Sequence, residues 1–183
     1  MKKTALLFIA ILTAIGICAQ TDNKMVYPQS TAWNHFVWGV EVGGAIDLTS
    51  NDMSTVNLDA YFGYRNELIQ ALGVGASVNM MVSNSVRSFP VYVLLRTNFR
   101  RSPSLLFMDL RGGVVFNNVS NGSQQTGMYL SPGVGINLAR SKTFNSYITL
   151  SYIYNGMQPF HKGSEYMDIN GLSMACLRLG INF

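Results

Sequence analysis

The feature that most constrains this chain is a strict alternation of residue types along eight separate stretches, in each of which one face carries no charged residue. In 105–116, for example, Asp109 and Arg111 share one face, while leucine, methionine, glycine, valine and phenylalanine occupy the other. Successive side chains of a β-strand point to opposite sides of the sheet, so a period of two predicts strands. The predicted strands run over 35–48, 54–64, 70–82, 88–99, 104–116, 126–139, 145–156 and 171–183.

Two long uncharged runs, 68–86 and 112–139, resemble membrane-spanning helices when hydropathy alone is considered. In the first run, however, glycine, serine and asparagine alternate with apolar residues at a period of two, which is the spacing of a strand. The second run is interrupted at 117–125 by asparagine, serine and glutamine, which favour a polar loop. Both runs are therefore predicted to form strands and their connections.

The first nineteen residues have the features of an export signal. Lys2 and Lys3 precede an apolar core, and Ala19 offers a plausible cleavage site. A lipoprotein anchored through Cys18 is disfavoured, because that class needs a small residue directly before the cysteine, and this chain has Ile17 there. We expect three parts: a cleaved signal peptide over 1–19, a periplasmic leader over 20–33 and a single barrel domain over 34–183.

Charge and cysteine content exclude several classes of function. The chain has 13 basic and 9 acidic residues, and it has no basic run with interleaved aromatic residues, so we expect no nucleic-acid partner. Only Cys176 remains after signal cleavage, so an intrachain disulfide is impossible and a closed hydrogen-bonded barrel must hold the domain together. The histidines, His35 and His161, lie far apart in sequence, so no metal site or other cofactor is predicted.

Alternation alone does not say which face of the barrel points outward. A water-soluble, lipocalin-like barrel would place the apolar face inside, whereas a transmembrane barrel would place it in lipid. Three features favour the membrane: the charged face is rich in glycine, no predicted strand contains lysine, and only 12% of residues are charged, against about 25% in ordinary soluble domains. Eight strands enclose an interior that side chains can fill. We therefore expect an interior ion-pair network of Glu41, Asp47, Asp59, Arg96, Asp109, Arg111 and Arg178.

With a periplasmic N-terminus, the connections of an up-and-down barrel alternate between the two sides of the membrane. The inner turns are short, and the outer loops are predicted at 49–53, 83–87, 117–125 and 157–170. Pro90 and Pro132 lie inside predicted strands, where each removes a ladder hydrogen bond, so we expect a bulge or a strand end near each. An aromatic girdle is expected near the inner rim from Trp33, Phe36, Trp38, Tyr64, Phe99, Phe144, Tyr147 and Phe183.

Four segments carry a family resemblance: FPVY at 89–92, FMDLRGG at 107–113, YLSPGVG at 129–135 and LRLGINF at 177–183. Together they resemble the small bacterial outer-membrane β-barrel domain family, with an architecture similar to the OmpA and OmpX barrels. The resemblance implies a single all-β, eight-stranded antiparallel up-and-down transmembrane barrel with a closed, side-chain-filled interior. It also implies a C-terminal insertion signal at Leu179, Ile181 and Phe183, and hence the barrel-insertion machinery as a transient partner. The fold itself fixes no activity.

Three functions of different classes remain open. The leading hypothesis is a non-enzymatic structural anchor in the outer membrane, in contact with lipid and lipopolysaccharide, whose loops 117–125 and 157–170 meet surface partners. The second is a transport or ligand-binding barrel with its mouth near Tyr92, Tyr129 and Met81. The third is a lipid-modifying hydrolase using His161 and Ser164, which is disfavoured because these residues lie in a glycine-containing loop rather than on one strand.

Overall fold

The computed structural model describes residues 35–49, 53–66, 68–82, 86–99, 105–119, 124–140, 144–162, 165–167, 169 and 171–183. Its main strands are β1 (Phe36–Asp47), β2 (Thr55–Tyr64), β3 (Ile69–Met81), β4 (Arg87–Asn98), β5 (Leu106–Asn118), β6 (Gln124–Arg140), β7 (Asn145–Asn155) and β10 (Leu172–Asn182). A separate small hairpin consists of β8 (Phe160–Lys162) and β9 (Glu165–Met167). The proposed signal peptide and leader, 1–33, lie outside the described residues.

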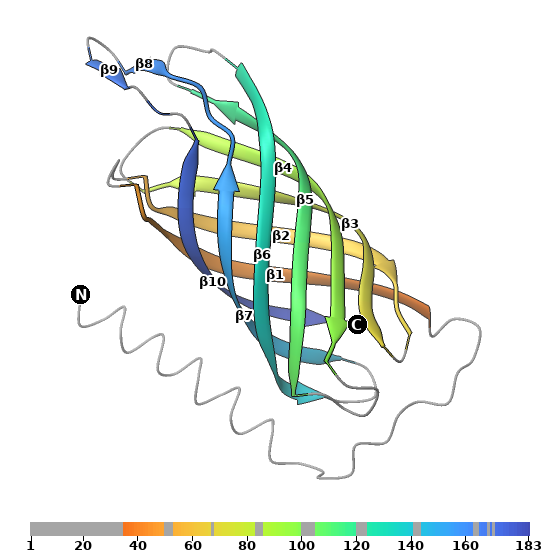
Figure 1. Cartoon of the computed structure of the whole chain (residues 1–183). Coiled ribbons are helices and arrows are strands. Elements are labelled where there is room, and N and C mark those ends of the chain that lie inside the picture. The colour runs from red at the N-terminus through yellow and green to blue at the C-terminus, as the bar shows by residue number, and fades with distance from the viewer. Residues whose placement is uncertain are drawn as a thin grey trace, which may run out of the picture.

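The eight long strands form one closed barrel in which each strand is antiparallel to the next, and β10 closes the sheet on β1 (Figure 1). The predicted all-β, up-and-down architecture is therefore confirmed, and the predicted strand ends agree to within about two residues. At the closure, the backbone N–H of Phe183 donates to the carbonyl oxygen of Trp38 at 2.9 Å. No helix among the described residues is long and apolar enough to cross a membrane.

The apolar face of every long strand points outward, and the charged face is buried. Leu58 is 60% exposed and Ile46 is 68% exposed, whereas Arg96 and Asp109 are completely buried. This distribution is the reverse of a water-soluble barrel, because such a protein buries its apolar side chains and hydrates its charges. The lipocalin-like alternative is therefore wrong.

Pro90 and Pro132 do not produce bulges, contrary to the prediction. Each continues in register with β5, opposite Val115 and Leu110 respectively. Each proline also interrupts the pairing with its second neighbouring strand: Pro90 interrupts the β3–β4 ladder, and Pro132 interrupts the β6–β7 ladder. The register is the same on both sides of each interruption. The missing N–H of proline explains these interruptions, since the neighbouring strand loses a donor there. The register shifts lie elsewhere, at Ile69/Ala71 and at Asn137/Ala139.

Two further predictions need correction. Residues 117–118 and 124–125 belong to β5 and β6, so the outer connection predicted at 117–125 is shorter than expected. Tyr147 is not part of an inner aromatic girdle, because its side chain is fully buried in the lumen. The rim does carry stacked rings elsewhere: Trp38 stacks on Phe183 with ring centroids 4.7 Å apart.

Aromatic rings inside the barrel lie over glycines of the neighbouring strand. Tyr147 is opposite Gly180, and Tyr61 is opposite Gly39. A Cβ atom added at Gly180 would lie 2.5 Å from the Tyr147 ring, and one added at Gly39 would lie 2.6 Å from the Tyr61 hydroxyl. The missing side chain of each glycine therefore makes room for the ring, which lets large aromatic residues fill a narrow lumen.

Gly180→Ala is expected to destabilise the barrel by about 1–3 kcal/mol, because the new methyl group overlaps the Tyr147 ring in a closely packed interior. Gly112→Ala is the matched control: its added Cβ would meet only the Leu130 side chain, at 3.6 Å, and should change stability by less than about 0.5 kcal/mol. Urea unfolding of the purified, refolded barrels, followed by gel mobility, measures both. Equal effects of the two substitutions would contradict the glycine–ring packing.

Candidate functional site: the filled barrel interior

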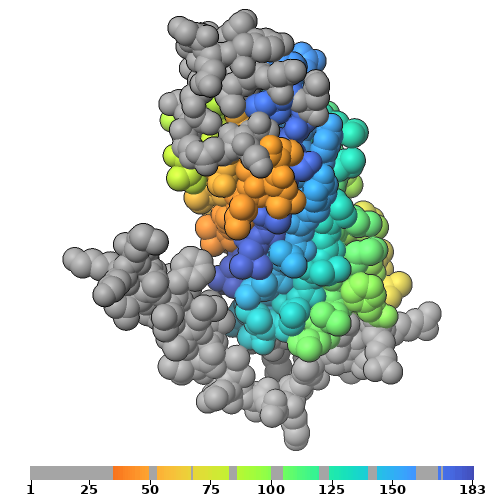
Figure 2. All heavy atoms as spheres, turned by 60° about the vertical axis from the view of Figure 1, so that its left-hand side comes forward, coloured from red at the N-terminus to blue at the C-terminus, as the bar shows by residue number. Residues whose placement is uncertain are grey.

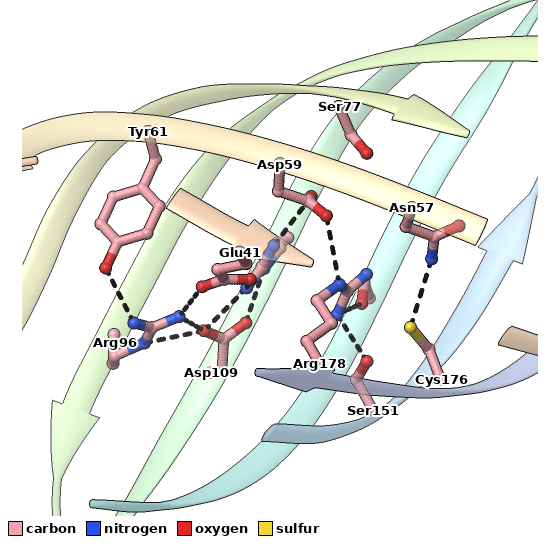
Figure 3. A network of polar contacts seen from close by, with 12 residues as sticks. Glu41, Asn57, Asp59, Tyr61, Ser77, Arg96, Asp109, Ser151, Cys176 and Arg178 are labelled. Atoms are coloured by element: carbon pink, nitrogen blue, oxygen red, sulfur yellow. Dashed lines mark hydrogen bonds and ion pairs between the residues drawn. The ribbon is translucent and has the colours of Figure 1, made fainter. Parts of the chain in front are cut away.

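Six charged side chains from five strands contact one another inside the lumen, and Figure 3 labels five of them. Alternation directs each of them inward, and all are at most 3% exposed. They comprise three carboxylates and three guanidinium groups, so the formal charges of the cluster cancel, as burial in a low-dielectric interior requires. We refer to Glu41, Asp59, Arg96, Asp109, Arg111 and Arg178 as the central ionic network.

Arg96 of β4 connects two of the carboxylates. Its Nη2 atom lies 2.7 Å from Glu41 Oε1 and 2.5 Å from Asp109 Oδ2, and its Nε donates to the same Asp109 oxygen at 2.9 Å. Its guanidinium carbon also lies 4.2 Å from the centroid of the Tyr147 ring and 5.0 Å from that of Phe107. Ion pairing and cation–π contacts thus hold this guanidinium from several sides.

Arg111 of β5 contacts all three carboxylates. Its nitrogens lie 2.6 Å from Glu41 Oε2, 2.8 Å from Asp109 Oδ1 and 3.1 Å from Asp59 Oδ1. Glu41 therefore bridges Arg96 and Arg111 through its two oxygens. Because the partners come from β1, β2, β4 and β5, the contacts cross the lumen and do not only follow neighbouring strands.

Arg178 of β10 extends the network toward the outer half of the barrel. It donates to the Ser151 hydroxyl at 2.6 Å and to the Tyr129 hydroxyl at 3.1 Å. Its Nε lies 3.6 Å from Asp59 Oδ2, an ion pair longer than a direct hydrogen bond. Nearby, the Asn57 amide donates to Cys176 Sγ at 3.3 Å, so Cys176 is a buried filler of the wall.

Asp47 lies outside the central ionic network, although the sequence analysis placed it there. It is half-buried at the outer end of β1. Its carboxylate accepts hydrogen bonds from the backbone N–H groups of Thr49, at 2.7 Å, and of Met53, at 3.2 Å. Its observed contacts therefore order the turn into the first outer loop.

An apolar layer fills the outer end of the lumen, and sequence reasoning missed it. Met157 and Ile169, at the two ends of the last outer loop, are buried there, and the Gly171 N–H donates to the Met157 carbonyl at 3.0 Å. Gly171 has a φ of +93°, which glycine adopts without strain. The outer apolar layer comprises Met53, Met81, Val86, Val115, Val119, Ile153, Met157, Ile169, Leu172 and Met174.

Amide side chains add a polar contact to the filled interior. The Asn117 and Asn155 side chains each donate to the other's oxygen at 3.1 Å, and the Ser88 hydroxyl donates to Asn117 at 2.6 Å. Tyr92 and Tyr129 are at most 2% exposed, and Met81 is 7% exposed. These last three residues are therefore buried inside the barrel rather than arranged around an open mouth.

The residues of the hydrolase hypothesis are not brought into a described site. The His161 side chain and the whole of Ser164 lie outside the described residues. Among the residues that are described, no group of three or more histidine, cysteine, aspartate or glutamate side chains is arranged to hold a metal ion. Leu179 and Ile181 lie on the outward face of β10, with Ile181 41% exposed, and Phe183 follows the end of that strand and is 39% exposed.

Comparison with known proteins gives structural matches only. No protein-family model and no curated protein sequence matches the chain. Neisserial surface protein A aligns over 81% of this chain and 94% of its own, with a TM-score of 0.50 and 14% identity. The N-terminal barrel domain of Pseudomonas aeruginosa OprF aligns over 80% and 97%, with a TM-score of 0.49 and 14% identity. Ail of Yersinia pestis aligns over 81% and 97%, with a TM-score of 0.40 and 13% identity. The chain thus has the fold of the small outer-membrane β-barrels of the OmpA and OmpX type.

Proposed function

We propose that this chain is an integral barrel of a bacterial outer membrane, where it acts as a non-enzymatic anchor and presents outer loops for surface contacts. The observation that carries the proposal is the inverted distribution of side chains, with an exposed apolar wall around a buried, charge-balanced network. In hydrocarbon, each unpaired backbone polar group costs several kcal/mol, and a β-sheet pairs all of its groups only when it closes on itself. The closed sheet, in which β10 pairs with β1, meets that requirement except beside Pro90 and Pro132, where the ladder is interrupted.

The orientation follows from the position of the chain ends. The start of β1 and the C-terminus lie at the same end of the barrel in Figure 1, which in an exported barrel is the periplasmic end. The β5–β6 connection and the connection from β7 to β10 then face outward, and the second contains the β8–β9 hairpin. Lipopolysaccharide is the expected lipid around this outer half. The exposed Ile181 and Phe183 of the last strand offer the barrel-insertion machinery its signal.

An anchor fits the lumen better than a channel does. The central ionic network and the outer apolar layer occupy successive levels of the interior with side chains. A solute would have to displace paired charges such as Arg96 and Glu41, which is costly because each partner would be left buried without its counter-ion. The surface loops are therefore the parts available for contacts.

Two measurements test the proposal. The protein should fractionate with the outer membrane, and the folded barrel should migrate differently on gels before and after boiling. In planar bilayers the purified wild type should show conductance no higher than a protein-free control. Recovery in the soluble exported fraction would contradict the membrane location, and stable, ion-selective currents would contradict the closed interior. Unchanged lipid A and phospholipid profiles after deletion would support the absence of lipid-modifying activity.

A further inference from the structure

The outward surface of the barrel carries a shallow apolar hollow, whose lining also includes the buried Ser151. A groove of about 490 Å³ crosses β5, β6, β7 and β10, strands that lie side by side on the wall facing the viewer in Figure 2. Its lining combines small or compact residues, Pro132, Gly133 and Ala175, with larger ones that include Leu110, Leu150 and Tyr152.

The groove lies where the β6–β7 ladder is interrupted. Leu130 pairs with Tyr154, and Gly133 pairs with Ser151, but the two residues between them on each strand are unpaired. Pro132 has no N–H to offer β7 and no long side chain to fill the space outside it. The missing backbone hydrogen bonds between β6 and β7 and the lack of a long side chain at Pro132 therefore occur at the same place on the outer wall.

A polar pair marks the outer end of this groove. The hydroxyls of Tyr152 and Ser173 lie 2.7 Å apart, and Tyr152 is 43% exposed on the apolar wall. Ser173 is the second residue of β10, close to the outer rim. Two hydroxyls carry two protons and their mutual bond uses one, so one O–H remains able to donate. The groove is thus apolar along its length and has a hydrogen-bond donor at its outer end.

We propose that this groove is a binding site for one ester-linked lipid of the outer leaflet, whose acyl chain lies in the groove and whose ester carbonyl accepts a hydrogen bond from the Tyr152–Ser173 pair. The inference rests on the proposed membrane location, because lipid chains are what this wall then meets. A flexible acyl chain can follow the shallow hollow between Leu110 and Leu150 more closely than the rigid wall of a second barrel can. The apolar lining lies toward the middle of the membrane and the Tyr152–Ser173 hydroxyls lie toward the outer rim, as do the acyl chain and the ester group of an outer-leaflet lipid.

The test compares two matched substitutions. Ala175→Phe fills the groove, and Ala60→Phe places the same ring on the exposed face of β2, on the far side of the barrel. Each barrel is refolded into dimyristoyl phosphatidylcholine vesicles, checked for heat-modifiable gel mobility, extracted into a mild detergent and weighed by native mass spectrometry. Wild type and Ala60→Phe should retain one lipid per barrel. Ala175→Phe should retain at least about tenfold less, since several methylene contacts are lost.

A second variant tests the polar end. Wild type should retain the ester-linked lipid better than its ether-linked analogue, and the double variant Tyr152→Phe, Ser173→Ala should abolish that preference while keeping the groove open, because it removes both hydroxyl donors. Equal retention by wild type and Ala175→Phe, or equal loss in Ala175→Phe and Ala60→Phe, would overturn the site. A dimer that disappears only in Ala175→Phe would also overturn it, by assigning the groove to a second copy. A failed gel-mobility check would instead count against the proposed membrane barrel itself.

Discussion

Arg96→Met should destabilise the folded barrel by about 3–5 kcal/mol, the cost expected when one member of a buried ion pair is removed and its partners remain charged. Arg96 contacts Glu41 at 2.7 Å and Asp109 at 2.5 Å, and its own side chain is fully buried. Methionine has a similar length and is apolar, so it leaves both carboxylates with one cation fewer. The variant also loses the cation–π contact with the Tyr147 ring.

The measurement is reversible urea unfolding in phospholipid vesicles, with folded and unfolded fractions separated by gel mobility. Arg87→Met is the matched control, because Arg87 is exposed at the outer end of β4 and its replacement should cost less than about 0.5 kcal/mol. The double variant Arg96→Met, Asp109→Asn should recover part of the loss, since it leaves two carboxylates facing two guanidinium groups and so restores the charge balance of the network. A cost for Arg96→Met equal to that of Arg87→Met would show that the network does not stabilise the barrel.

The strand pattern and the direction of each face were predictable from local sequence. A side chain two residues along a strand returns to the same face, so the inward position of Asp109 fixes that of Arg111 without knowledge of the register. The same rule places Tyr147 inward with Thr149 and Ser151, as the structure shows. Its assignment to the rim girdle was an error of inference, since the sequence already carried the correct signal.

The pairing of particular side chains was not predictable in the same way. Which ring lies over which glycine depends on the stagger between neighbouring strands, and a period of two is compatible with several staggers. The contact between Arg111 and Glu41 crosses the lumen from β5 to β1, so it depends on closure of the whole barrel. The sequence predicted all six members of the central ionic network, but not which carboxylate pairs with which guanidinium group.

The two ends of the lumen show a different limit. The inward face was defined in the sequence by its charged and glycine residues. Inward apolar residues near the strand ends, such as Met174 and Val115, were therefore not predicted to form a separate layer. The β8–β9 hairpin was also missed, although Gly163-Ser164 between two short alternating runs is a two-residue turn signal. Asp47 shows that an inward-facing charged residue does not always join the ionic network. Near the end of a strand, its carboxylate instead accepts a hydrogen bond from the backbone of the following turn.

Leu150→Arg should destabilise the barrel in a bilayer by about 2–4 kcal/mol, because it places a cation on the lipid-facing wall near the middle of the membrane. Leu150 is the central residue of β7 and is 57% exposed. The matched control is Leu48→Arg, which is also 57% exposed but lies just beyond the outer end of β1. There the guanidinium can reach water and headgroups, so the expected cost is about 0–1 kcal/mol.

Both variants are unfolded with urea in phospholipid vesicles and compared with wild type. The depth dependence is the decisive quantity, since the two sites have equal exposure and receive the same side chain. If the outer wall faced water, an arginine at either position would be hydrated and both substitutions would change stability by less than about 0.5 kcal/mol. Such a result would remove the membrane from the explanation of the apolar wall. A larger cost at Leu150 than at Leu48 requires a low-dielectric medium centred on the middle of the barrel, which is the property that a lipid bilayer supplies and water does not.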